Sequence, residues 1–160
     1  MKKRDIRRLA MQLLYQADLN GSADREAMLA DLEGGFDPPQ VAQPAVELAL
    51  AAWDRRDQAD RAVAQLAPAW PTHRQPPVDR ALLRLAYYEM VSGITPPKVA
   101  INEAIELAKK YASEQSPPFL NGVLDKLARE LKQAGQLPEA DASDPPSSWA
   151  DPWLRDALDE

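Results

Sequence analysis

Residues 78–90 read VDRALLRLAYYEM, and this stretch predicts a helix at the centre of the fold. Its apolar side chains recur at helical spacing on two sides, with Val78, Leu82, Leu85 and Ala86 on one and Leu83, Tyr87 and Met90 on the other. A helix that is apolar on two sides is central or faces a partner. We therefore expect a central helix over residues 78–92, which Gly93 ends.

Two further helices follow, and all three begin in the same way. Proline pairs stand at residues 76–77, 96–97 and 117–118, where the start of a helix tolerates the missing backbone N–H. The spacing predicts helices over 98–112 and 119–133. The side chains expected to be buried are Ile101, Ala104, Ile105, Ala108, Leu120, Val123, Leu124, Leu127 and Leu131. Glu106 and Lys110 are expected to form a surface pair.

The N-terminal part of the chain is also predicted to be helical. Apolar periodicity indicates a first helix over residues 5–19, ended by Asn20-Gly21. A short helix over 23–33, capped by Ser22, and a longer one over about 45–66 follow. No segment up to residue 135 alternates with the two-residue period of a strand, so the fold class is all-α.

Composition divides the chain into three parts. The proline-rich segment near residues 68–77 predicts a boundary between two helical subdomains, residues 1–73 and residues 74–135. Residues 136–160 are rich in Pro, Asp, Ser and Ala, a composition that cannot bury enough apolar surface to offset ordering. We expect this acidic C-terminal tail to be disordered.

The net charge of −6 is unevenly distributed. Residues 136–160 hold seven acidic residues and one basic residue, whereas residues 1–135 hold 18 of each. Residues 1–18 contain two acidic residues, Asp5 and Asp18, and five basic ones: Lys2, Lys3, Arg4, Arg7 and Arg8. Such asymmetry indicates a basic recognition patch plus an acidic tail.

The exposed face of the first helix suggests what the patch binds. Opposite its apolar stripe it is predicted to present Arg4, Arg8, Met11 and Tyr15, flanked by Arg7 and Gln12. Basic groups hold phosphates and an aromatic ring stacks on an unpaired base, as in the recognition of single-stranded RNA. The alternative is a solvated basic face with Tyr15 packed between helices, and the pattern alone leaves both open.

Several function classes are excluded or disfavoured. The chain has no cysteine, one histidine (His73) and six scattered glycines, so it lacks a disulfide, a cysteine nucleophile and a phosphate-binding loop. Glu103 and Glu106 are one helical turn apart but no histidine lies nearby to complete a metal site, and they are interpreted as a solvated face. We expect a cytoplasmic protein with no enzymatic activity, cofactor, metal or membrane span.

Three blocks in the second half of the chain resemble the NusB family in their order and spacing. They are residues 78–90, residues 97–111 (PKVAINEAIELAKKY) and residues 119–128 (FLNGVLDKLA). Residues 7–15 (RRLAMQLLY) are similar to the family's opening helix. The resemblance covers residues 1–20 and 70–131 and is weak between residues 21 and 66.

This resemblance implies a NusB-like fold of two three-helix subdomains packed together and a role in transcription antitermination. The implied partners are the single-stranded boxA element of nascent ribosomal RNA, the small-subunit ribosomal protein NusE and the RNA polymerase antitermination complex. Together with the basic patch, it gives as RNA-binding residues Lys2, Lys3, Arg4, Arg7, Arg8, Tyr15, Ser116, Phe119 and Asn121. It also implies that the central helix offers NusE the side chains of Asp79, Arg80, Arg84, Tyr88 and Glu89. Two departures from the family pattern, Asp5 and Pro117-Pro118, predict weaker RNA binding.

Other interpretations stay open. One is a helical module related to that of ribosomal RNA cytosine methyltransferases, an enzyme that needs cysteines. Another is a protein-interaction adaptor without RNA binding, which salt-dependent RNA affinity would distinguish because phosphate contacts release counterions. A further hypothesis is that the acidic tail folds back on the first helix as an RNA mimic, anchored by Trp149 and Trp153.

Overall fold

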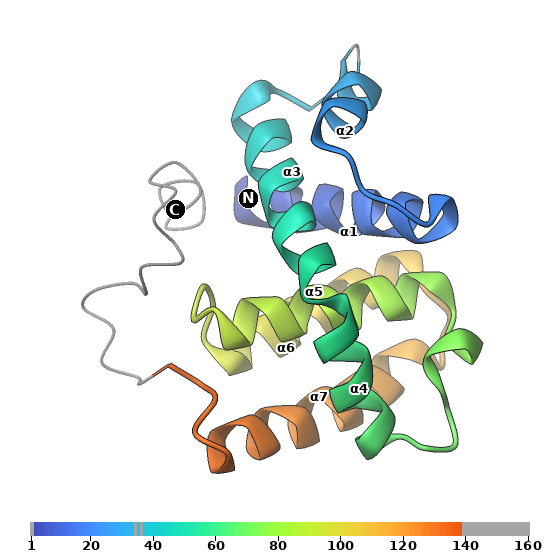
Figure 1. The fold of residues 1–160 in the computed structure, drawn as a ribbon, viewed down its shortest axis with the longest axis vertical. Helices are drawn as coiled ribbons and strands as arrows, with labels where there is room; N and C mark the ends of the chain where they lie inside the picture. Colours follow the sequence, from blue (N-terminus) through green and yellow to red (C-terminus); the bar gives the residue numbers. More distant parts are fainter. Residues whose placement is uncertain (1, 34, 36, 139–160) are drawn as a thin grey trace.

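The computed structural model describes residues 2–33, 35 and 37–138, and within them the chain is helical with no strand. The elements, shown in Figure 1, are α1 (Lys2–Asn20), α2 (Arg25–Leu32), α3 (Pro39–Asp54), α4 (Arg56–Leu66), the 3-10 helix η1 (Thr72–Arg74), α5 (Pro77–Val91), α6 (Pro97–Tyr111) and α7 (Ser116–Gln133). The all-α prediction is confirmed. The predicted disorder of residues 136–160 falls mostly on residues 139–160, outside the described part.

The three C-terminal helices lie where the prolines predict them. Pro76 and Pro96 precede α5 and α6, whose first residues, Pro77 and Pro97, need no intrahelical N–H partner. Helix α7 begins at Ser116, three residues before the predicted start, because Pro117 and Pro118 lie inside its first turn.

Two details of helix α6 were predicted wrongly. Its buried side chains are those of Ala100, Ala104, Leu107 and Ala108, while Ile101 and Ile105 are only half-buried. The buried face is therefore rotated from the predicted one. Glu106 accepts a hydrogen bond from Lys109, three residues later, at 3.2 Å, instead of pairing with Lys110.

Helix α1 is longer than predicted, and the cap of α2 is a different residue. Gly21, with φ of 75°, ends α1 in the left-handed region that favours glycine. The cap of α2 is Asp24, not Ser22, and its Oδ2 accepts a hydrogen bond from the backbone N of Ala27 at 2.9 Å. The carboxylate thus satisfies one of the N–H groups at the helix start.

The single helix predicted over about residues 45–66 is two helices. Helix α3 already begins at Pro39, and the chain leaves helical geometry at Arg55 (φ −99°, ψ 8°) before α4 begins. Arg56 holds this corner, since its guanidinium lies 4.1 Å from the centre of the Trp53 ring and donates to the Trp53 carbonyl oxygen at 2.9 Å. No proline or glycine marks the break.

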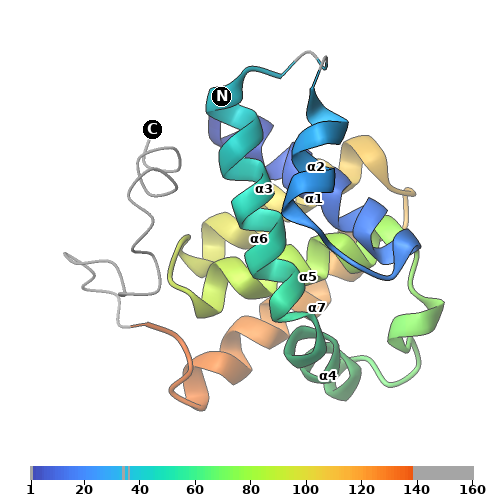
Figure 2. The same ribbon diagram turned by 45° about the horizontal axis from the view of Figure 1, so that its top comes forward.

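Helix α5 is central, as its two apolar sides predict. It contacts α1, α3, α4, α6 and α7, and every side chain from Ala81 to Met90 is buried. Figures 1 and 2 show α3 crossing α1 on one side of it, while α6 and α7 pack against α5 and against each other. The buried residues form one continuous apolar cluster.

The two-subdomain division stays a prediction. Helix α4 lies before the predicted boundary at residue 73 but packs on α5 and α7. In the described part of the chain, no helix is both long enough and apolar enough to cross a membrane.

Candidate functional site

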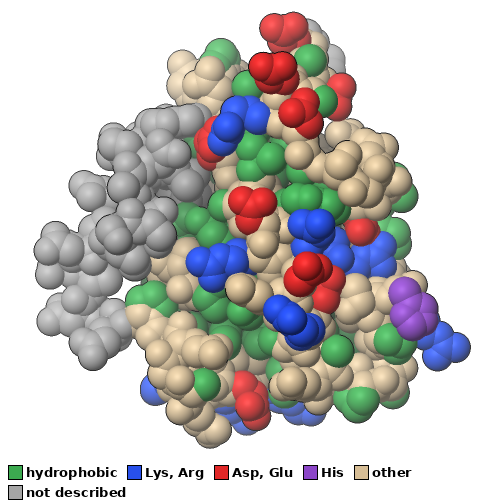
Figure 3. All heavy atoms as spheres, viewed as in Figure 1, with side chains coloured by type: hydrophobic (Ala, Val, Ile, Leu, Met, Phe, Trp, Pro, Cys, Tyr) green, Lys and Arg blue, Asp and Glu red, His purple; other side chains and the backbone are tan. Residues whose placement is uncertain are grey.

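The face of the molecule shown in Figure 3 is mixed in charge. Acidic side chains gather at the top, over α2, and basic and acidic side chains alternate below, over α3 and α4. A nucleic-acid surface needs basic groups that outnumber the acidic ones locally. Basic side chains that lie close together occur instead between α1 and α6.

Helix α1 exposes only part of the predicted basic face. Arg4 and Tyr15 are exposed, as the helical projection predicts, whereas Arg8, predicted on the same exposed face, is half-buried. Arg7 and Met11 are buried, so their predicted exposure is wrong. The reason is that both α3 and α5 pack against α1, which widens its covered face beyond one apolar stripe.

Arg7 forms a buried ion pair across the fold. Its Nε donates to Glu89 Oε1 at 2.7 Å and its Nη2 to Thr95 Oγ1 at 3.1 Å. Thr95 Oγ1 donates in turn to Glu89 Oε1 at 2.8 Å. Burial raises the pKa of the Glu89 carboxyl, while Arg7 and Thr95 act in the opposite direction. This network fixes α1 against α5 and the start of α6.

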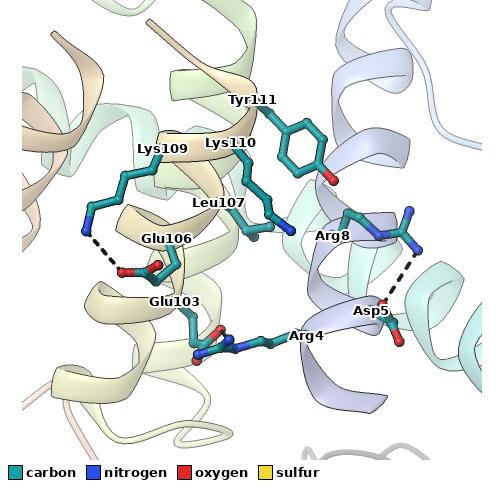
Figure 4. A pocket seen from close by; sticks show the side chains of 9 residues that line it. All are labelled: Arg4, Asp5, Arg8, Glu103, Glu106, Leu107, Lys109, Lys110 and Tyr111. Atoms are coloured by element: carbon teal, nitrogen blue, oxygen red, sulfur yellow. Dashed lines mark hydrogen bonds and ion pairs between the residues drawn. The ribbon is translucent and has the colours of Figure 1, made fainter. Parts of the chain in front are cut away.

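A groove of about 240 Å³ lies between α1 and the C-terminal half of α6. Four basic side chains, one aromatic ring, one leucine and three acidic side chains line it, as Figure 4 shows: Arg4, Asp5, Arg8, Glu103, Glu106, Leu107, Lys109, Lys110 and Tyr111. Glu103, Lys110 and Tyr111 of α6 point toward α1, whereas Lys109 and Glu106 pair with one another on the side of α6 away from α1. Lys109, Lys110 and Tyr111 were not among the residues predicted for the site, although two lysines next to a tyrosine at a helix end were a visible signal.

Arg4 and Arg8 of the groove are paired with acidic groups from several elements. Arg4 Nε lies 3.5 Å from Glu103 Oε2 on α6, and Arg8 Nη2 lies 2.7 Å from Asp37 Oδ1, before α3. Arg8 is also 3.9 Å from Asp5. Such exposed or half-exposed pairs are weak in water, so a phosphate can replace the carboxylate as the acceptor.

The predicted residues of α7 lie in a second cluster. Ser116 is buried beside Ser113 Oγ at 3.1 Å and contacts Asp79 of α5, Phe119 is half-buried, and Asn121 is exposed. The Phe119 ring stacks on Trp70 with ring centres 5.2 Å apart. Lys3 is half-buried, and the side chain of Lys2 lies outside the described part of the structure.

The five side chains expected to face NusE lie mainly inside the protein. Arg84 makes a two-pronged ion pair with Asp60 at 2.8 and 3.0 Å, and both Arg84 and Arg80 bind Asp18. Asp79, Tyr88 and Glu89 are buried. These contacts join α1, α4 and α5, and a direct role in partner binding stays a prediction.

The described residues hold no group of three or more His, Cys, Asp or Glu side chains arranged to bind a metal.

Similarity to known proteins gives the family of this chain. The NusB family model matches residues 4–129. The chain belongs to the NusB family. Family members are transcription antitermination factors and not enzymes.

Relatives with this function resemble the chain over most of its length. It is 37% identical to the transcription antitermination protein NusB of Symbiobacterium thermophilum, over 90% of this chain and 100% of that protein. It is 40% identical to NusB of Saccharopolyspora erythraea, over 76% of this chain and 83% of that protein.

Solved structures share the fold. T. maritima NusB is 30% identical, with a TM-score of 0.70 over 80% of this chain and 91% of that chain. A crystal structure of the antitermination factors NusB and NusE in complex with dsRNA gives a TM-score of 0.69 at 24% identity, over 81% of this chain and 97% of that chain. The all-α topology is therefore that of NusB proteins.

Proposed function

We propose that this chain binds the single-stranded boxA element of nascent ribosomal RNA in the cytoplasm, together with NusE, as part of the RNA polymerase antitermination complex. The observation that carries the proposal is the groove between α1 and α6, which Arg4, Arg8 and Lys110 line together with Tyr111, while Lys109 lies at its edge and pairs with Glu106. Basic groups hold phosphates and an exposed aromatic ring stacks on a base. The structure of a NusB–NusE pair bound to RNA on the same fold supports the choice of partners.

The buried residues have a positioning role in this proposal. Arg7 binds Glu89 and Thr95, so it orients α1 while Arg4 and Arg8 meet the phosphates. In the same way Arg80 and Arg84 tie α5 to Asp18 of α1 and so shape the surface offered to NusE. Tyr15, Lys3 and Asn121 extend the RNA surface from the groove, whereas Ser116 is buried and supports the start of α7.

The test is binding of a labelled single-stranded boxA-like RNA across a salt series, with and without NusE. Arg4→Ala/Arg8→Ala and Lys109→Ala/Lys110→Ala should each weaken binding at least about tenfold and lower the salt slope by about two, one for each lost phosphate contact. The matched control is Arg55→Ala/Arg61→Ala, which removes two exposed basic groups near and on α4. Equal loss in the control, or none in the groove variants, would contradict the groove assignment.

An adaptor without RNA binding is the second candidate. It is favoured by the ion pairs that already occupy Arg4, Arg7 and Arg8 within the chain. Under this interpretation the native protein binds NusE but not RNA at any salt concentration, with or without NusE.

A further inference from the structure

The two tryptophans in the described part of the chain serve the fold to different degrees. Trp53 is 8% exposed, and the guanidinium groups of Arg56 and Arg84 lie 4.1 and 5.7 Å from its ring centre. Trp70, between α4 and η1, leaves 39% of its surface exposed. Its ring packs against the Phe119 ring, with the ring centres 5.2 Å apart and an angle of 33° between the ring planes. Burial in the core therefore accounts for Trp53 but not for Trp70.

The backbone around Trp70 is held in place. Its N–H donates to the Ala67 carbonyl oxygen at 3.0 Å, and its own carbonyl oxygen accepts from Gln75 Nε2 at 3.2 Å. Gln75 is buried, and its carbonyl oxygen accepts a hydrogen bond from Arg80. A ring on a braced segment loses little conformational entropy when a ligand stacks on it.

The surroundings of Trp70 match those of a base-stacking site. Phe119 lies near the start of α7, two residues before the exposed Asn121. The Trp70 ring covers one side of the half-buried Phe119 ring and leaves part of its own surface exposed. The exposed side chains of His73 and Arg74 follow in η1, and the guanidinium of Arg74 supplies positive charge for a phosphate. Aromatic rings bordered by basic groups are the usual platform for unpaired bases.

We infer that Trp70, stacked on Phe119, is an RNA-binding residue that takes an unpaired base of the single-stranded RNA. This inference rests on the proposed function and extends the RNA path from the α1–α6 groove to the N-terminal end of α7. Phe119 then acts as the support beneath the stacking ring. Stacking uses the face of the base, which every base has, and leaves the hydrogen-bonding edge of the base and the sugar-phosphate backbone free for other contacts. The site therefore tolerates any base.

The experiment measures the affinity for labelled single-stranded boxA-like RNA and the quenching of intrinsic tryptophan fluorescence by unlabelled RNA. Trp70→Leu keeps apolar cover over Phe119 but removes the flat ring, and should weaken binding about tenfold. Trp70→Phe should keep most of the affinity while losing most of the quenching. Leu19→Ala, which truncates another exposed apolar side chain, is the matched control and should bind like the native protein.

The outcomes separate this inference from the proposed function. Thermal unfolding of each variant verifies that it is folded. Native-like affinity of a folded Trp70→Leu protein, with quenching unchanged in Trp70→Phe, would overturn the stacking role and leave RNA binding in the groove intact. A native protein that fails to bind RNA would overturn both.

Discussion

Asp79 is a carboxylate in the protein interior, and its Oδ1 has no hydrogen-bond partner. Burial raises the pKa of this carboxyl above its ordinary value of 3.8, and the hydrogen bond with Ser116 offsets only part of the rise. Because the pKa is raised in the folded state, the stability that Asp79 contributes is complete below pH 3.8. It is lost as the pH rises through the folded-state pKa.

Asp79→Asn removes this titration. We expect the variant to gain free energy of unfolding relative to the native protein as the pH rises from about 4 to about 7, because only the native protein must then bury a charge. Urea denaturation of both proteins over this range gives the difference. Asp31→Asn, at an exposed carboxylate, is the matched control for the loss of one charge. A difference between Asp79→Asn and native protein that stays constant with pH would contradict the expectation.

For single residues, the sequence predicts which side chains are exposed better than it predicts which side chains pair with one another. The helical projection correctly leaves Arg4 and Tyr15 on the surface of α1. It fails at Arg7, whose partner Glu89 is 82 positions away in the chain. Local periodicity records one apolar stripe, whereas tertiary packing decides which polar side chains meet beneath the surface.

Among the elements, helices are predicted more reliably than their ends. Proline pairs locate the starts of α5 and α6, because proline fits a first turn for a local steric reason. The break between α3 and α4 was missed, since Arg55 is neither proline nor glycine. The contacts of Arg56 with Trp53 accompany this corner, and such contacts leave no mark in the local pattern.

Arg56→Ala tests how much these contacts stabilise the corner. The substitution removes a guanidinium stacked on Trp53 and a hydrogen bond to the last turn of α3, so we expect the free energy of unfolding to fall by about 1–2 kcal/mol. Arg55→Ala, one residue earlier and exposed, should change it by less than about 0.5 kcal/mol. Chemical denaturation measures both variants. Equal effects would mean that loss of charge, rather than the Trp53 contact, determines the result.

In the whole molecule, the candidate site is formed by two helices that are far apart in the sequence. The groove needs α1 from the N-terminal part and α6 from the C-terminal part, and α5 holds both through buried contacts. The sequence indicated α1 as a wall of the site because its basic residues are close together along the chain. The second wall, at Lys109, Lys110 and Tyr111, is a basic and aromatic cluster in the sequence, but it joins the site only because the fold places α6 beside α1.

The distribution of charge over the whole chain leads to the last prediction. Residues 139–160 carry seven acidic residues and Arg155, so their removal takes the net charge from −6 to zero. The long-range repulsion between these acidic residues and RNA is then lost. We therefore expect the affinity for single-stranded boxA-like RNA to increase several-fold at about 0.05 M salt. Above about 0.3 M salt the affinity should change little, because charges are screened within a few ångströms.

A full-length variant with the seven acidic residues changed to Asn or Gln separates charge from contact. If charge alone acts, this variant and the truncated chain bind RNA equally well at each salt concentration, and the Arg4→Ala/Arg8→Ala substitutions reduce the affinity of both. If the acidic segment instead contacts α1 as an RNA mimic through Trp149 and Trp153, the truncated chain binds more tightly than the neutralised one, and the difference persists at higher salt. Native affinity in both variants at low salt would contradict either form of the effect.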